Sequence, residues 1–176
     1  LIAGGQNAMF RSVEGAEDSP EQAAADLMAI SPNPLTSADV VCGITASGRT
    51  PYVLGAIRYA HSLGCPTILV STNPKDVVRK HCPEAQVLIC PVVGPEPITG
   101  STRMKSGTAQ KMILNMITTA SMVRIGKTYG NVMVDLQLTN QKLVERARKI
   151  VMTIGNVDYE GASQLLTAAD GHVKTA

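Results

Sequence analysis

The sequence predicts an α/β fold with a parallel sheet, and three features of its first 125 residues lead to that prediction. Short apolar runs alternate with helical patterns, the links between them are short, and two runs are almost continuous in apolar residues: DVVCGI at 39–44 and PTILVS at 66–71. Continuous apolar strands are typical of parallel sheets covered by helices on both faces. The alternation indicates βαβ units.

The expected elements follow from caps and breakers along the chain. Ser19-Pro20-Glu21-Gln22 offers a helix cap, a proline at the first helical position and a capping-box glutamine. A second helix begins after Thr50-Pro51 and ends before Gly64, and Asn73-Pro74 opens a short third helix. The apolar runs predict four strands, at 1–3, 39–44, 66–71 and 86–92.

The pattern changes after Gly94, where a loop rich in Gly, Pro, Ser and Thr leads into a long helix that ends near Gly126. We expect its methionines, Met112, Met116 and Met122, to fill a core. Further helices are predicted to start at Asn140 and at Asp158. The sequence thus predicts an α/β domain over residues 1–125 and a helical C-terminal appendage over residues 126–176.

Composition excludes several classes of protein. The 176 residues carry 16 basic and 14 acidic side chains and only 3% aromatics, which argues against a nucleic-acid partner. Four separated cysteines and three scattered histidines give no metal-ligand spacing. Thiols expected to be reduced indicate a cytoplasmic protein. No apolar run is long enough to span a membrane, so no membrane partner is expected.

The segment ASGRT at 46–50 follows a predicted strand and precedes a predicted helix. Open parallel sheets bind ligands at this position, and a helix N-terminus attracts anions. Gly48 permits an unusual backbone path, and Ser47 and Thr50 add hydroxyl groups. The alternative is that Thr50 is only a helix cap, Ser47 a turn residue and Arg49 a solvated charge. The local motif leaves both interpretations open.

A second segment, TGSTRMKSGT at 99–108, places five hydroxyl groups and two cations in ten residues beside another helix start. A cap needs only one or two hydroxyl groups, so the excess favours a phosphorylated, polyhydroxylated small molecule. The spacings of a Walker A loop and of a dinucleotide-binding fingerprint are both absent. We therefore expect a phosphosugar site.

A third segment, RSVEGAED at 11–18, holds three acids within five residues. Charge pattern alone favours a solvated acidic cluster in front of a helix. The functional alternative is that one carboxylate lies in the ligand crevice as a general base.

These segments together resemble the N-acetylmuramic acid 6-phosphate etherases. The motifs RSVEGAED, GITASGRTPYV, STNP, TGSTRMKSGTAQKMILNM and YGNVMVDLQLTNQKL carry the resemblance, which covers nearly the whole chain. That family has the sugar isomerase (SIS) fold and is related to the glucokinase regulatory protein. The resemblance implies a flavodoxin-like sheet, a homodimer, and no metal or organic cofactor.

The resemblance also implies a reaction and its residues. The D-lactyl ether of N-acetylmuramic acid 6-phosphate is eliminated and water adds, giving N-acetylglucosamine 6-phosphate and D-lactate. Glu17 aligns with a family glutamate that acts as base, and Ser47 aligns with the phosphate-binding serine of SIS domains. Gly48 and Thr50 lie in the same loop. Three further residues lie in the second substrate loop: Ser101, Thr102 and Lys105.

The sequence departs from the family pattern in one respect, because it does not contain the family's N-terminal part. In the family a second glutamate, the acid, lies upstream of the segment matching Leu1, together with a first strand and its phosphate loop. The resemblance therefore implies a fragment that lacks the N-terminal part of a longer protein and ends within a helical tail. The alternatives are a phosphosugar-sensing regulator of the SIS family, which would not need Glu17, and a sugar-phosphate isomerase.

Overall fold

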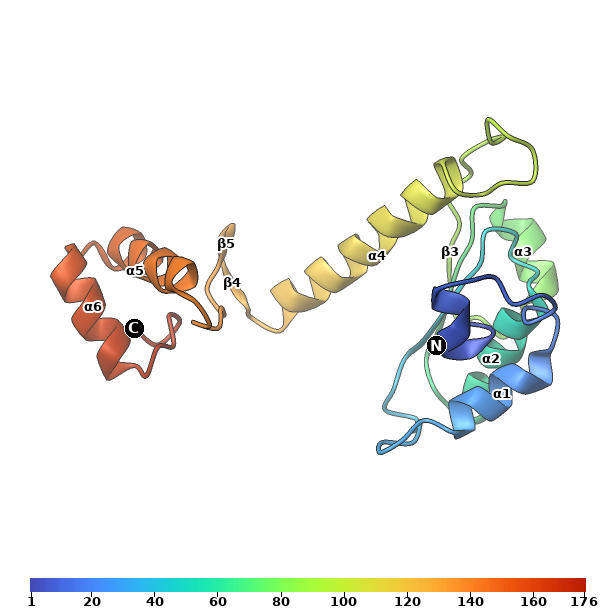
Figure 1. Ribbon diagram of the computed structural model, residues 1–176, viewed down its shortest axis with the longest axis horizontal. Coiled ribbons are helices and arrows are strands. Elements are labelled where there is room, and N and C mark those ends of the chain that lie inside the picture. Colours follow the sequence, from blue (N-terminus) through green and yellow to red (C-terminus); the bar gives the residue numbers. More distant parts are fainter. The chain divides into compact units, whose positions relative to one another are not determined.

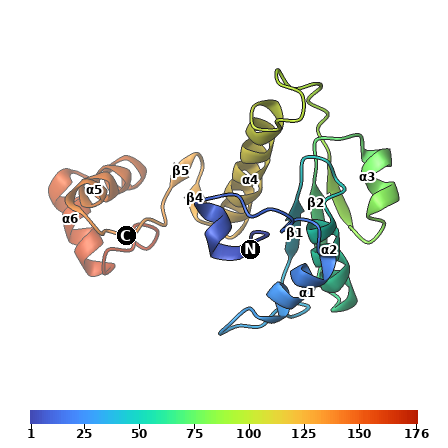
Figure 2. The same ribbon diagram turned by 45° about the vertical axis from the view of Figure 1, so that its right-hand side comes forward.

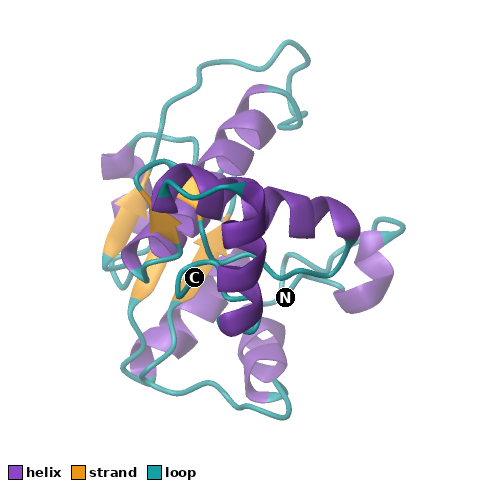
Figure 3. Ribbon diagram, turned by 90° about the vertical axis from the view of Figure 1, so that its left-hand side faces the viewer, coloured by secondary structure: helices purple, strands orange, loops and turns teal.

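A computed structural model describes residues 1–176. The chain forms two compact units, Leu1–Ile113 and Leu114–Ala176, and the boundary falls within helix α4 (Lys105–Arg124). Helices make up most of the regular structure (Figure 3). None of the helices combines the length and the apolar character needed to cross a membrane.

The first unit is built on a parallel sheet of three strands, β1 (Val41–Ile44), β2 (Thr67–Val70) and β3 (Val87–Ile89), in the order β1-β2-β3 (Figure 2). Helix α2 (Pro51–Ser62) joins β1 to β2, and α3 (Lys75–His81) joins β2 to β3. The α/β fold class predicted from the sequence, a parallel sheet flanked by helices, is therefore confirmed.

The core of this unit lies between the sheet and the two connecting helices. Gly43 of β1 lets α2 approach closely, because a Cβ atom there would lie 2.8 Å from Val53 Cγ1. This packing fixes the carboxyl ends of β1 and β2, from which the candidate loops emerge. The buried cluster consists of Leu54, Ile57, Leu69, Val78, Cys82, Ala85 and Leu88.

Helix α1 (Pro20–Met28) packs against α2, as the blue and teal helices of Figure 1 show. Ser19 Oγ accepts a hydrogen bond of 3.1 Å from the Gln22 N–H, so the predicted cap is present. The Gln22 side chain donates to Asp26 at 2.7 Å instead of returning to Ser19, so only half of the capping box forms.

The predicted strand at 1–3 is wrong. Residues 3 and 4 form a turn that leads into a 3₁₀ helix, η1 (Gly5–Met9), and Leu1 is 79% exposed. The sheet has no strand beside this segment for it to pair with, and the chain turns directly after it, where Gly4 and Gly5 have φ angles of 85° and 65°.

The expectation that the methionines of α4 fill a core is also wrong. Met112, Met116 and Met122 are 48%, 60% and 44% exposed, and Ser106 is the one buried residue of the helix. Met112 and Met116 are one helical turn apart and share a face, but no other helix or strand packs extensively along α4, so this face stays exposed.

The second unit contains a short antiparallel hairpin, β4 (Thr128–Tyr129) and β5 (Val132–Met133), followed by α5 (Gln141–Gly155) and α6 (Tyr159–Ala168). Both helix starts agree with the sequence. Asn140 Oδ1 accepts from the Leu143 N–H at 3.0 Å, and Asp158 Oδ1 accepts from the Gly161 N–H at 2.8 Å. The buried cluster consists of Val134, Leu136, Ala147, Val151, Ala162, Leu166 and Val173.

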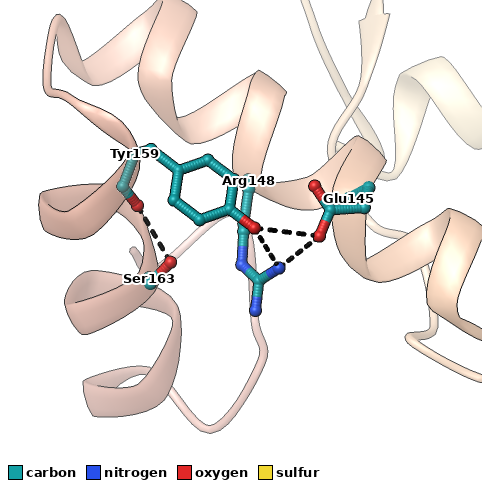
Figure 4. Close-up of polar contacts among 4 residues, drawn as sticks. All are labelled: Glu145, Arg148, Tyr159 and Ser163. Atoms are coloured by element: carbon teal, nitrogen blue, oxygen red, sulfur yellow. Dashed lines mark hydrogen bonds and ion pairs between the residues drawn. The ribbon is translucent and has the colours of Figure 1, made fainter.

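A polar cluster joins α5 to α6 at the surface of this unit (Figure 4). The Arg148 guanidinium pairs with the Glu145 carboxylate and donates to the Tyr159 hydroxyl at 2.7 Å. That hydroxyl donates in turn to Glu145 at 3.1 Å, and the guanidinium carbon lies 5.1 Å from the centre of the Tyr159 ring. These groups satisfy one another, and we assign them a structural role in α5–α6 packing.

Candidate functional site

The loop after β1 carries a cluster of three hydroxyl groups. Thr45 Oγ1 lies 2.8 Å from Thr50 Oγ1 and 3.3 Å from Ser47 Oγ. Ser47 Oγ also accepts from the Arg49 N–H at 3.1 Å, so the loop is folded on itself. The Thr50 side chain makes no capping bond to α2. The interpretation of Thr50 as a plain helix cap therefore does not describe its contacts.

Gly48 is the one residue of this loop whose backbone and surroundings both require glycine. Its φ angle is 72°, and a Cβ atom there would lie 2.7 Å from Val78 Cγ2 and 3.0 Å from Ser71 Oγ. The loop therefore packs closely against α3 and against Ser71, which follows β2. Close packing of this kind holds the neighbouring N–H groups at the start of α2, where the helix dipole favours an anion.

The carbonyl oxygen of Ala46 ties this loop to the segment after β2. Four donors lie within hydrogen-bond distance of it: Ser71 Oγ at 3.0 Å, the Thr72 N–H at 3.1 Å, Thr72 Oγ1 at 3.1 Å and Asn73 Nδ2 at 2.9 Å. Ser71 and Thr72 are both buried. The STN segment at 71–73 therefore fixes the position of the loop at 46–50.

Thr72 also reaches the second predicted loop. Its Oγ1 lies 2.9 Å from Ser106 Oγ, and both side chains are buried. Since the single hydroxyl proton of Thr72 is donated to Ala46, Ser106 must donate to Thr72. Through Thr72, which is 34 residues from Ser106 in sequence, the structure thus connects the 46–50 loop with the N-terminal turn of α4.

The first turn of α4 is capped by a residue from outside the helix. Glu96 accepts from the Lys105 N–H and from the Ser106 N–H, each at 3.0 Å. These two backbone hydrogen bonds hold the pKa of the Glu96 carboxyl below its ordinary value. The next two N–H groups, of Gly107 and Thr108, donate to backbone carbonyl groups. The donors at this helix start are therefore occupied.

The predicted residues of the second loop lie just before and at this capped turn. Ser101 is half-buried and its N–H donates to Ile98 O at 3.1 Å, whereas Thr102 and Lys105 are exposed. The Thr102 carbonyl oxygen accepts from the Gly107 N–H at 3.0 Å. All three side chains are accordingly carried by a backbone that is fixed at both ends.

The backbone of Glu17 is hydrogen-bonded to the first turn of α2. Its carbonyl oxygen accepts from the Tyr52 N–H at 3.0 Å, and its side chain is exposed. The Tyr52 hydroxyl donates to Asp26 at 2.6 Å, and burial, followed by this bond, raises the pKa of Tyr52 to about 12. The acidic segment is thus anchored beside the loop at 46–50.

No sequence pattern assigns a role in this site to Thr45, Thr72 or Glu96, and Ser106 enters only as one of the five hydroxyl residues at 99–108. Thr72 lies within the STNP motif, and Thr45 directly precedes the ASGRT segment. Their partners lie far away in sequence or use backbone groups, so periodicity gives no signal for them. A surplus of hydroxyl residues at strand ends is the one hint that the sequence offered.

Comparison with known proteins finds one matching domain family and several related enzymes. Residues 1–61 match the family described as glucokinase regulatory protein N-terminal SIS domain. Over its whole length the chain is 57% identical to the N-acetylmuramic acid 6-phosphate etherase of Salinibacter ruber, covering 55% of that protein. It is 54% identical to the etherase of Pectobacterium atrosepticum and 52% identical to that of Clostridioides difficile, covering 56% of each.

The chain is therefore homologous to these etherases along its whole length, which confirms the resemblance predicted from its motifs. It spans about half the length of the curated relatives it matches.

Proposed function

We propose that this chain contributes to a carbon–oxygen lyase that cleaves the D-lactyl ether of N-acetylmuramic acid 6-phosphate. The products are N-acetylglucosamine 6-phosphate and D-lactate, in the recycling of cell-wall sugars. The observation that carries the proposal is that all three motif segments lie around one edge of the sheet, linked by Thr72 and Tyr52. The relatives at 52–57% identity support the same reaction.

The phosphate group is assigned to the loop at 46–50. Ser47 and Thr50 supply hydroxyl donors, Gly48 lets the loop pack against Val78 and Ser71, and the N-terminus of α2 adds its dipole. The sugar hydroxyl groups are assigned to Ser101, Thr102 and Lys105. The Lys105 ammonium is exposed at the loop and would add a positive charge for an anionic substrate.

Glu17 is assigned the role of general base. In the open-chain sugar the C2 hydrogen is acidic because C2 adjoins the aldehyde, so a carboxylate can remove that proton. The electron pair of the C2–H bond forms the C2–C3 double bond as the C3–O bond breaks, and lactate leaves after its ether oxygen gains a proton. Water then adds across the double bond, with hydrogen at C2 and hydroxyl at C3. Every assigned step is acid–base chemistry, and no cofactor is part of the proposal.

The proposal includes a homodimer in the cytoplasm. The family resemblance implies the dimer, and the exposed Met112, Met116 and Val123 on α4 are consistent with a subunit contact. Four free cysteines are consistent with a reducing compartment. Sedimentation of the natural protein that contains this sequence would measure the subunit number.

The experiment that tests the function is an assay of D-lactate release from N-acetylmuramic acid 6-phosphate, with the natural protein that contains this sequence. Glu17→Gln should lower kcat by about 10²- to 10⁴-fold, the usual contribution of a general base. Its affinity for N-acetylglucosamine 6-phosphate should stay within a few-fold of wild type. Glu14→Gln, in the same acidic segment, is the matched control and should keep normal turnover.

Two results would contradict the assignment. Binding of the sugar phosphate without any lactate release would indicate a phosphosugar-sensing regulator. Normal turnover by Glu17→Gln would remove Glu17 from the chemistry while leaving the etherase reaction in place.

A further inference from the structure

Helix α4 begins without a capping side chain of its own. The residue before its first turn is Met104, whose thioether sulfur is only a weak acceptor compared with the oxygen of a usual cap. Glu96 takes that role from nine residues upstream and receives the N–H groups of Lys105 and Ser106 at 3.0 Å each. Its carboxylate closes residues 97–104 into a loop with fixed ends.

The loop closed in this way contains the residues assigned to the sugar. Ser101 and Thr102 lie between Glu96 and the helix, and Lys105 is the residue whose N–H the carboxylate holds. Movement of the start of α4 would therefore move Ser101, Thr102 and Lys105 together.

The fixed turn is also connected to the phosphate loop by buried hydrogen bonds. Glu96 holds the Ser106 N–H, Ser106 Oγ donates to Thr72 Oγ1 at 2.9 Å, and Thr72 Oγ1 donates to Ala46 O at 3.1 Å. Ser106 is 4% exposed and Thr72 is 8% exposed, so water does not readily replace these bonds. Ala46 directly precedes Ser47.

We infer that Glu96 is a positioning residue, which keeps the sugar-binding loop at a set distance from the phosphate loop by acting through Ser106 and Thr72. The inference rests on the proposed function, since it concerns the same substrate. Glu17 is anchored separately, by the Tyr52 N–H of α2. Loss of Glu96 should therefore weaken substrate binding while the base keeps its place.

The test compares Glu96→Ala, Glu96→Gln and Ser106→Ala in the natural protein that contains this sequence. Glu96→Ala should raise KM about tenfold and leave kcat within threefold of wild type. Glu96→Gln, which keeps one acceptor oxygen, should recover most of the loss. Glu96→Ala and Ser106→Ala should be less than additive, because both interrupt one chain of bonds.

Asp158→Ala is the matched control. Asp158 caps α6 by the same chemistry, accepting from the Gly161 N–H at 2.8 Å, but it belongs to the second unit. Both cap deletions should lower the melting temperature, and only Glu96→Ala should change KM. A variant that merely lost folded protein would show a lower apparent kcat with an unchanged KM.

A second readout separates this inference from the etherase assignment. The dissociation constant for N-acetylglucosamine 6-phosphate is measured by calorimetry, which needs no turnover. If wild-type protein binds this sugar phosphate but releases no lactate, the etherase assignment fails, and a tenfold weaker affinity of Glu96→Ala still supports positioning. An affinity of Glu96→Ala within threefold of wild type, or no binding by wild type, would overturn the positioning role.

Discussion

The Glu17 carbonyl oxygen accepts a hydrogen bond of 3.0 Å from the Tyr52 N–H, and this bond joins the acidic segment to the first turn of α2. Two further contacts support it. The Tyr52 hydroxyl holds Asp26 at 2.6 Å, and Pro20 lies directly against Gly55. The position of the proposed base therefore depends on how α1 packs against α2, which makes that packing testable through activity.

Gly55→Ala should destabilise the protein and lower kcat. An added Cβ atom would lie 2.3 Å from the Pro20 carbonyl oxygen, so α1 must move, and overpacking of this kind costs about 1–3 kcal/mol. Gly155→Ala is the control, because its Cβ atom would meet nothing closer than 3.8 Å at the end of α5. Urea unfolding and lactate assays measure both effects. Equal stability of the two variants would contradict the packing argument.

Gly48→Ala should cost more stability than Gly94→Ala. The two glycines have nearly the same φ angle, 72° and 74°, so the backbone strain of the replacement is matched. Gly48 alone is crowded, with Val78 Cγ2 at 2.7 Å from an added Cβ atom, whereas nothing lies within 4 Å at Gly94. We expect an extra loss of about 1–3 kcal/mol at Gly48, together with weaker sugar-phosphate binding. If both variants lose the same free energy of unfolding, measured by heat or urea, backbone strain alone would account for the loss and the crowding argument would be wrong.

Ser47→Ala should weaken binding of the phosphate group by about tenfold. It removes one hydroxyl donor and leaves the backbone N–H groups and the helix dipole in place, a loss near 1.4 kcal/mol. Calorimetry with N-acetylglucosamine 6-phosphate measures the change, and unphosphorylated N-acetylglucosamine is the control ligand. A similar loss of affinity for both ligands would mean that Ser47 does not contact the phosphate group.

Tyr52→Phe should reduce stability by about 1 kcal/mol near neutral pH, because it removes the hydrogen bond to Asp26. That bond lowers the pKa of Asp26 from 3.8, and burial followed by the bond raises the pKa of Tyr52 from 10.0 to about 12. The lowered carboxyl pKa gives stability that is lost as pH falls below about 4. The raised tyrosine pKa gives stability that is lost as pH rises from 10 toward 12.

The difference between wild type and Tyr52→Phe should therefore be largest between about pH 5 and 9 and smaller on either side. Urea unfolding at pH 3, 7 and 11 measures it. Tyr129→Phe is the control, since that side chain is 64% exposed. A difference that does not vary with pH would show that the hydroxyl acts by packing alone.

The sequence predicted those elements whose signals are local. The strands after Asp39, Pro66 and Gln86 are predictable because buried parallel strands need continuous apolar runs. Ser19, Asn140 and Asp158 are recognisable as caps because a cap bonds to a residue three positions later. The strand at 1–3 failed because an apolar tripeptide carries no information about a pairing partner.

The site was only half predictable for the same reason. The segments at 46–50 and 99–108 stand out by composition, but the contacts that organise them link residues 25 to 34 positions apart. Glu96 lies outside any pattern of helix capping, since its partners follow nine and ten positions later. Only the folded chain brings such groups together.

The Ala46 carbonyl oxygen has a consequence for mutational studies of this site. Every amino acid supplies that oxygen, so a saturation library at position 46 would report tolerance for any side chain small enough to fit. The contribution of these hydrogen bonds would be detected instead by substitutions at positions 71–73, which hold the donors. Replacing the amide that follows Ala46 by an ester, which weakens its carbonyl as an acceptor, would expose through chemical synthesis a contribution that genetic screens cannot see.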